Sequence, residues 1–245
     1  MRSRDIAHEA KEKKQSIESI ARKYRYDFCI ELAQTHHAEV ILTAHHIDDR
    51  IETMCFNLLR GSKLGGIHAL KKENTLANGV ILLRPFLSLE KEELQKYAEE
   101  HHISFREDSS NQENIYLRNR LRNTILPEFH TINPEYKKAL SNFIGYSEAL
   151  QDWIDENIQI WFLLQGCKED EFHFSVQEFI DTHAFLQKEI VRYMFEKTNQ
   201  GSVGLSEGNI EEILRFIRDA EGNTVKHIKK LFLKKEKGRI LISSK

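Results

Sequence analysis

Residues 41–61, which read ILTAHHIDDRIETMCFNLLRG, combine a short apolar stretch, a polar turn and an amphipathic helix. Residues 40–44 are apolar and partly β-branched, which predicts a buried strand. The apolar positions after the turn recur at helical spacing, and they are Ile47, Ile51, Met54, Cys55, Leu58 and Leu59. Gly61 ends this pattern. Asp49, with Glu52 three residues later, predicts a capping box in which Asp49 is the cap.

Four polar side chains fill the turn between the predicted strand and helix, namely His45, His46, Asp48 and Asp49. In open α/β sheets, ligands bind at the carboxyl ends of the strands. An aspartate before a helix is often only a cap, and a histidine can satisfy a backbone carbonyl, so each residue alone has a structural explanation. Because capping needs only one of the four, the group as a whole indicates a binding or catalytic site.

The composition is that of a soluble globular protein with one large domain or two modest ones. The chain has 245 residues, of which 40% are hydrophobic and 30% charged. No apolar run approaches the ~20 residues of a membrane span, and the charged N-terminal stretch lacks the apolar segment of a signal peptide. Cys29, Cys55 and Cys167 are widely spaced and form no CxxC pair. They predict a reducing cytoplasm and argue against a zinc ribbon, an iron–sulfur site or a persulfide relay.

Basic residues are unevenly distributed, although the net charge is only −2. Arg118, Arg120 and Arg122 follow one another with no acidic residue between them. Residues 225–245 are rich in lysine and contain a single acidic residue, Glu236. A basic tail of this kind fits an anionic partner and a solvated lysine face equally well.

The remaining patterns predict an α/β region followed by a mainly helical one. We expect helices at residues 16–37, at 89–101 with Ser88 as the cap, from Asn133-Pro134 to about Leu164, and at 183–197 and 206–219. We expect strands at residues 80–83, 103–105 and 172–176, and a closing hairpin at 225–233 and 239–243. The helix after Pro134 would be roughly 45 Å long unless Gly145 breaks it. These segments predict a first domain over residues 1–127 and a second over residues 133–245.

Basic side chains from other segments could face the same crevice as the polar turn, and they are Arg22, Arg25 and Arg60. Carboxylates beside basic groups suit Mg²⁺ and nucleotide phosphates, and a helix N-terminus adds a partial positive charge. The HEXXH, GxSxG and Walker A patterns are absent. From the residues alone we therefore expect phosphate or metal chemistry at the end of a parallel strand.

Four blocks of the sequence resemble the tRNA(Ile)-lysidine synthase family of N-type ATP pyrophosphatases. They read IESIARKYRYDFCIELA, ILTAHHIDDRIETMCFNLLRGS, LLRPFL and REDSSNQENIYLRNRLRNTILPEF, in the family's order from Ile17 to Phe129. The AHHxDD pattern is shared with relatives that thiolate tRNA, whereas DxSNxxxxYxRNxxR is more specific to lysidine synthases. The resemblance implies an α/β fold with an incomplete parallel sheet of the adenine nucleotide alpha hydrolase type. A mainly helical tRNA-binding domain with a short C-terminal hairpin would follow it.

The resemblance also implies a reaction and a set of site residues. The family uses ATP to adenylate the C2 carbonyl oxygen of the wobble cytidine in tRNA(Ile) with a CAU anticodon, and the amine of free lysine then displaces AMP to give lysidine. A cytoplasmic ligase without membrane association is implied, and a homodimer is left open. By motif position, the catalytic residues are His46, Asp48 and Asp49, with Asp48 and Asp49 also binding Mg²⁺. The implied ATP contacts are Arg22, Arg25, Arg60 and Gly61, the implied tRNA contacts are Arg118, Asn119 and Arg122, and Glu52 serves only as a cap.

Two features depart from the family pattern. Arg50-Ile51 stands where the family often has Gln-Ala, with little expected effect. The SGGxDS phosphate loop has no counterpart, so we expect an N-terminally truncated lysidine synthase with weak ATP binding, because that loop's N–H groups would cradle pyrophosphate. The absent strand would leave residues 40–44 as an open apolar edge. A tRNA-thiolating relative, which the lack of paired cysteines disfavours, and a non-catalytic RNA-binding remnant are the alternatives.

Overall fold

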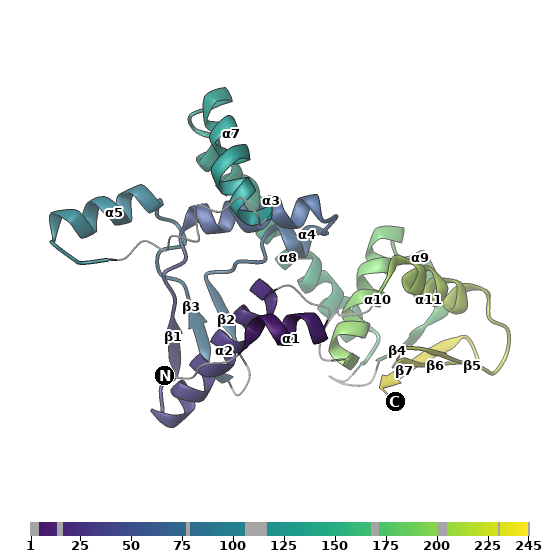
Figure 1. The fold of residues 1–245 in the computed structure, drawn as a ribbon. Coiled ribbons are helices and arrows are strands. Elements are labelled where there is room, and N and C mark those ends of the chain that lie inside the picture. Colours follow the sequence, from purple (N-terminus) through teal and green to yellow (C-terminus); the bar gives the residue numbers. More distant parts are fainter. Residues whose placement is uncertain are drawn as a thin grey trace. The chain divides into compact units, whose positions relative to one another are not determined.

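The computed structural model describes residues 5–13, 17–76, 79–105, 117–167, 172–199, 205–229 and 231–244. The chain forms two compact units, Met1–Glu148 and Ala149–Lys245. Each unit has its own sheet and its own helices (Figure 1). The division falls within one long helix, and the predicted domain limits at residues 127 and 133 stay a prediction about which segments fold independently.

The first unit contains a three-stranded sheet in the order β1-β3-β2. β1 (Val40–Leu42) runs parallel to β3 (Ile81–Leu83), and β2 (Glu73–Thr75) pairs with β3 in the antiparallel direction. Among the strands that the structure describes, β1 lies at the edge of this sheet, where Val40 is 42% exposed and Leu42 is 64% exposed. The prediction of a buried strand here is therefore wrong, and the prediction of an open apolar edge is confirmed.

The helices that precede and follow β1 in the chain carry the side chains that lie near the polar turn. The helices of this unit are α1 (Ile6–Glu12), α2 (Ile17–Thr35), α3 (Ile47–Leu59), α4 (Leu64–Ile67), α5 (Lys91–Glu100), α6 (Leu117–Arg120), the π-helix η3 (Leu121–Ile125) and α7 (Leu126–Ile132). The N-cap of α5 is Glu90 instead of the predicted Ser88, and residues 103–105 form no strand. The connection between the parallel strands β1 and β3 contains α3, as parallel pairs need a crossover that is usually helical, and it also contains α4 and β2.

The π-helix η3 has a local cause in the sequence. Pro127 lies two residues after its last residue, Ile125, and has no backbone N–H, so the regular hydrogen-bond ladder is interrupted. The N–H of Leu126 donates instead to the carbonyl oxygen of Leu121, five residues back. Such π-turns recur at functional sites. This one carries Arg122, which extends toward α3.

The core of the first unit is built on one stripe of α3. Ile47, Ile51 and Met54 are almost completely buried and pack with Leu126 of α7 and Ile144 of α8 (Tyr136–Leu164). Burying a side chain of this size contributes about 1.5–3 kcal/mol to the free energy of unfolding. α8 continues through Gly145 without a break. Within the part of the chain that the structure describes, no helix has the length and apolarity to cross a membrane.

The second unit contains a four-stranded antiparallel sheet in the order β4-β7-β6-β5. Its strands are β4 (Phe172–Ser175), β5 (Thr224–Ile228), β6 (Leu231–Glu236) and β7 (Arg239–Ser244), and its remaining helices are α9 (Val176–Asp181), α10 (Ala184–Asn199) and α11 (Glu207–Asp219). The predicted strand at residues 225–233 is in fact two strands that turn at Lys229, whose φ is +58°. The predicted closing hairpin is present as the antiparallel pair β6–β7, but it is part of a four-stranded sheet and does not stand alone.

Part of the basic tail is used inside the second unit. Lys235 is buried, and its Nζ donates to the carbonyl oxygen of Ile217 (2.8 Å) at the C-terminal end of α11. Lys226 pairs with Glu212, and Lys234 pairs with Glu236. A lysine at a helix C-terminus satisfies carbonyl groups that have no partner in the helix. These lysines therefore have a structural use that does not require an anionic partner.

Candidate functional site

Helix α3 begins at Ile47, with His46 as its N-cap. The backbone N–H of His46 donates to Oδ2 of Asp49 (3.1 Å), so Asp49 closes the start of the helix from its third position. The prediction that Asp49 is the cap is therefore wrong, because the N-cap is His46, three residues earlier than that pattern suggested. His46 Nε2 also lies 3.4 Å from Asp49 Oδ2, which packs the imidazole against the first turn.

Asp48 joins the first turn of α3 to two other helices. Its Oδ1 lies 2.8 Å from Nζ of Lys137 on α8, and its Oδ2 accepts a hydrogen bond from the Lys91 N–H at the start of α5 (3.0 Å). His46 Nδ1 lies 3.4 Å from the same Oδ2. Burial would raise the pKa of Asp48, but hydrogen bonds from His46, Lys137 and the Lys91 N–H hold it well below its usual range.

Lys137 sits among three carboxylates. Besides Asp48, its Nζ contacts Glu90 (2.9 Å) and Glu92 (3.0 Å). Burial would lower the pKa of Lys137, but hydrogen bonds to these carboxylates raise it well above its usual range. The Asp48 carboxylate is thus part of an ion-pair cluster that fixes how the polar turn meets α5 and α8.

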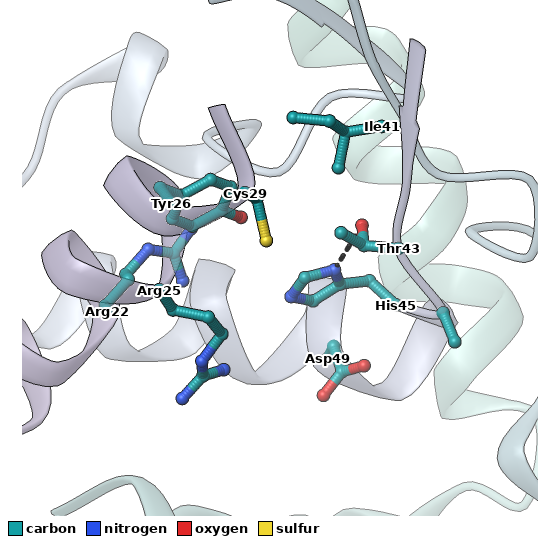
Figure 2. Close-up of a pocket in the computed structure, with 9 residues that line it drawn as sticks. Arg22, Arg25, Tyr26, Cys29, Ile41, Thr43, His45 and Asp49 are labelled. Carbon is teal, nitrogen blue, oxygen red and sulfur yellow. Dashed lines mark hydrogen bonds between the residues drawn. The ribbon is translucent and has the colours of Figure 1, made fainter. Parts of the chain in front are cut away.

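A cavity of about 450 Å³ lies between α2 and the carboxyl end of β1, and we refer to it as the strand-end cavity. It is lined by Arg22, Arg25, Tyr26, Cys29, Ile41, Thr43, Ala44, His45 and Asp49. Figure 2 shows side chains of α2 on one side, including both arginines, and His45 and Asp49 on the other. Two guanidinium groups, an imidazole and a carboxylate therefore share one cavity.

His45, not His46, is the histidine of the strand-end cavity. Its Nδ1 lies 2.9 Å from Oγ1 of Thr43, which fixes the ring (Figure 2). Burial lowers the pKa of His45, and nearby arginines lower it further, although Asp49 acts in the opposite direction. The imidazole is therefore neutral near pH 7 and able to accept a proton.

Glu52 is a buried carboxylate between two arginines, and it does not cap α3. Its side chain is 1% exposed, and both of its oxygens accept hydrogen bonds from Arg122, one from Nε (2.5 Å) and one from Nη2 (2.8 Å). Arg118 Nε lies 3.4 Å from Glu52 Oε2, and its Nη2 donates to Oγ1 of Thr53 (3.1 Å). The hydrogen bonds from Glu52 raise the pKa of Arg122. Glu52 thus holds α6 and η3 against α3.

A second cavity, of about 250 Å³, lies farther along α3, and we refer to it as the arginine cavity. It is lined by Ser19, Arg22, Thr53, Phe56, Asn57, Arg60, Ala69, Leu70 and Arg118. Arg22 lines both cavities, and the guanidinium of Arg60 lies 5.1 Å from the centre of the Phe56 ring. We expected Arg22, Arg25 and Arg60 to face one crevice. The structure has two cavities instead, since Arg25 lines the strand-end cavity and Arg60 lines the arginine cavity.

The other predicted site residues fall into two groups. Gly61 adopts a φ of +74° directly after α3, and no atom lies within 4 Å of a Cβ built on it, so its described role is to end the helix. Asn119 shares α6 with Arg118, while Arg122 contacts Asp49 Oδ1 at 3.4 Å.

Among the described residues, no group of three or more His, Cys, Asp or Glu side chains is arranged to hold a metal ion.

The sequence analysis placed His45 in the polar turn but not among the catalytic residues, and it gave Glu52 only the role of a cap. Both lie in the block that the prediction started from, so the sequence signal was present. Glu52 follows Asp49 by three residues and therefore lies on the same side of α3, which was a usable indication. The choice between His45 and His46 depends on the residue at which the helix begins, and the pattern did not fix that residue.

A parallel strand pair whose carboxyl end opens into a cavity with two arginines, a histidine and an aspartate is typical of nucleotide-binding α/β proteins. Residues 1–129 match the PP-loop domain family. The chain therefore belongs to this family.

The curated relatives of the chain belong to a narrower group within this family. The chain is 38% identical over 148 residues to a tRNA(Ile)-lysidine synthase of Enterococcus faecalis, covering 60% of the chain and 32% of the relative. It is 31% identical over 220 residues to that of Francisella philomiragia (87% and 52%) and 27% identical over 215 residues to that of Nostoc sp. (87% and 61%). The chain thus spans between a third and three-fifths of the length of these relatives, and the predicted resemblance to this family is confirmed.

Proposed function

We propose that this chain takes part in the ATP-dependent ligation of lysine to C2 of the wobble cytidine in tRNA(Ile) with a CAU anticodon. The strand-end cavity is the observation that carries the proposal, because it joins Arg22 and Arg25 to His45 and Asp49 in a chain similar to tRNA(Ile)-lysidine synthases. The guanidinium groups of Arg22 and Arg25 can bind phosphates. The imidazole of His45 and the carboxylate of Asp49 can bind an amine.

The proposed reaction has two steps that balance. The C2 carbonyl oxygen of cytidine bonds to the α-phosphorus of ATP, and pyrophosphate leaves. The lysine amine then bonds to C2, the C2–O bond breaks, and AMP leaves with that oxygen while the amine loses a proton. Arg22 and Arg25 neutralise phosphate charge in the first step and stabilise the departing AMP in the second.

We assign proton acceptance to His45, in place of the predicted His46. When Nδ1 carries a proton and donates to Thr43, Nε2 is left as an acceptor for the proton of the attacking amine. The lowered pKa of His45 keeps this nitrogen unprotonated near neutral pH. Asp49 lines the same cavity, and its negative charge favours a cationic substrate group. His46 serves as the N-cap that positions both residues.

The described residues do not offer Mg²⁺ the pair of carboxylates expected at Asp48 and Asp49. Oδ1 of Asp48 pairs with Nζ of Lys137, and Oδ2 accepts a hydrogen bond from the Lys91 N–H, so both oxygens already have partners within the protein. Asp49 lines the strand-end cavity and keeps the role of a predicted ligand. The roles proposed for Arg22, Arg25 and His45 do not depend on a metal ion.

The test is to incubate the chain with ATP, labelled lysine and a tRNA(Ile) transcript with a CAU anticodon, and to identify the modified nucleoside by mass spectrometry. Lysidine is the expected product, and His45→Gln should abolish it while His36→Gln, at an exposed site, should not. A sulfur-containing nucleoside would instead support a thiolating enzyme. Binding of tRNA with no modification by the chain would reduce its function to RNA binding.

A further inference from the structure

The arginine cavity is built on a stripe of α3 next to the stripe that enters the core. Phe56 and Asn57 lie three and four residues after Thr53, and Arg60 lies four and three residues after them, so all four share one side of the helix. Asp49 continues the same stripe one turn earlier, inside the strand-end cavity. The two cavities thus follow one helix face and meet at Arg22.

The charge of this cavity favours an anion. Three guanidinium groups line it, and none of the described lining residues is acidic. Glu52 contacts Arg118 from the buried side, and Thr53 accepts a hydrogen bond from the same guanidinium, so Arg118 is held in place before any ligand arrives. A free lysine ammonium would be repelled here, whereas a phosphate would find charged and hydroxyl donors.

The shape of the cavity favours a flat group beside the anion. Phe56 and Leu70 supply apolar surface, and the guanidinium of Arg60 stacks over the Phe56 ring at 5.1 Å. Bases of single-stranded RNA stack on aromatic rings and on guanidinium planes. The volume of about 250 Å³ lies below the ~300–1,000 Å³ of sites for drug-sized ligands, so the cavity suits one nucleotide and not a whole nucleoside triphosphate.

We propose that the arginine cavity binds one nucleotide of single-stranded RNA, with its phosphodiester among Arg22, Arg60 and Arg118 and its base against the Phe56–Arg60 pair. This moves Arg60 from the predicted ATP contacts to the RNA contacts. The identity of the RNA as tRNA(Ile) rests on the proposed function, whereas the binding of a single-stranded nucleotide rests on the cavity alone. Through Arg22, the bound nucleotide would lie beside the strand-end cavity.

The experiment measures binding of a fluorescently labelled single-stranded heptaribonucleotide containing CAU to the whole chain, by anisotropy at several salt concentrations. Arg60→Ala should weaken binding about 5- to 20-fold and lower the salt slope by about one. Phe56→Leu should weaken binding by a similar factor at unchanged salt slope, because it removes stacking and no charge. Lys96→Ala, at a 78% exposed site on α5, is the matched charge control and should bind as the original chain does.

Three results would overturn the inference. The first is unchanged RNA affinity in both Arg60→Ala and Phe56→Leu, and the second is no RNA binding by the unaltered chain. The third is a loss of AMP or ATP binding in these variants with RNA binding intact, which would show that the arginine cavity binds ATP, as first predicted for Arg60. Failure of the proposed function is separate, because it would leave these binding effects in place while no lysidine is formed. Unfolding curves of both variants show whether the fold is intact.

Discussion

Nζ of Lys137 lies 2.8 Å from Oδ1 of Asp48, so an ion pair joins the start of α8 to the first turn of α3. Both side chains are more than four-fifths shielded from solvent, at 17% and 18% exposure. Contacts of Lys137 with Glu90 and Glu92 extend the pair into a cluster. Asp48, the first aspartate of the HHxDD block, is therefore held by protein groups, and its substitution tests the fold before it tests chemistry.

Lys137→Met should lower the free energy of unfolding at pH 7 by about 1–3 kcal/mol, because it leaves three carboxylates without their common cation. The exposed neighbour Lys138 offers the control, and Lys138→Met should change it by less than about 0.5 kcal/mol. Urea denaturation of both variants measures the difference. Equal stability of the two variants would contradict a structural role for the cluster.

The pH dependence of this pair has a defined sign. Asp48 has a lowered pKa in the folded state, so its contribution is present above about pH 4 and is lost as the pH falls through the lowered value. Lys137 has a raised pKa, so its contribution is present below about pH 10 and is lost as the pH rises through the raised value. The effect of Lys137→Met should therefore be largest between these limits and shrink in strong acid, as urea titrations at pH 7 and in acid would show.

Glu52→Gln should destabilise the first unit by about 3–5 kcal/mol, because it leaves two guanidinium groups beside a neutral buried group. Adding Arg122→Met to this variant should recover part of the loss, which a double-mutant cycle would measure. Glu100→Gln, at a 60% exposed site, is the control and should have almost no effect. A mild effect of Glu52→Gln would mean that water reaches this carboxylate.

His45→Gln should reduce lysidine formation about 10²- to 10⁴-fold if His45 accepts the proton of the amine. Because the pKa of His45 is lowered from 6.5, the rate of the unaltered protein should rise with pH through a value below 6.5 and then level off. The variant should lack this rise. A pH–rate profile that keeps the same rise in His45→Gln would assign the proton acceptor to another group.

Lys235→Met should lower the stability of the second unit by about 1–3 kcal/mol, because carbonyl groups at the end of α11 lose a charged donor. RNA affinity should change less than about twofold, since this ammonium is already bound within the protein. Lys234→Met, at the neighbouring and more exposed position of β6, is the matched control for stability. Thermal unfolding and anisotropy provide the two measurements.

Local patterns in the sequence predicted the elements around the site. Helical periodicity located α2, α3, α8 and α11, and Ser206 caps α11 as its side-chain type suggests. The four-stranded sheet was not predictable in the same way, because β4 pairs with β7 across more than sixty residues of chain. The turn at Lys229 also carries no glycine to mark it.

The residues of the candidate site also differ in whether local sequence patterns could predict their roles. Residue types and spacing identified Arg22, Arg25 and Asp49, which do line one cavity. Glu52 looked like a cap because an acidic residue in a first turn usually is one, and only its contact with Arg122, 70 residues away in the chain, shows another role. Long-range contacts of this kind leave no mark on local periodicity.

The open side of β1 has a consequence for how the sheet can grow. Along this edge, backbone N–H and C=O groups alternate beside the exposed side chains of Val40 and Leu42, and no described strand covers them. An uncovered apolar edge of this kind is a template with which a further extended segment can pair, from the same chain or from a second molecule. Such an addition would leave the β1–β3 pairing untouched, and it would enlarge the platform from which the polar turn projects.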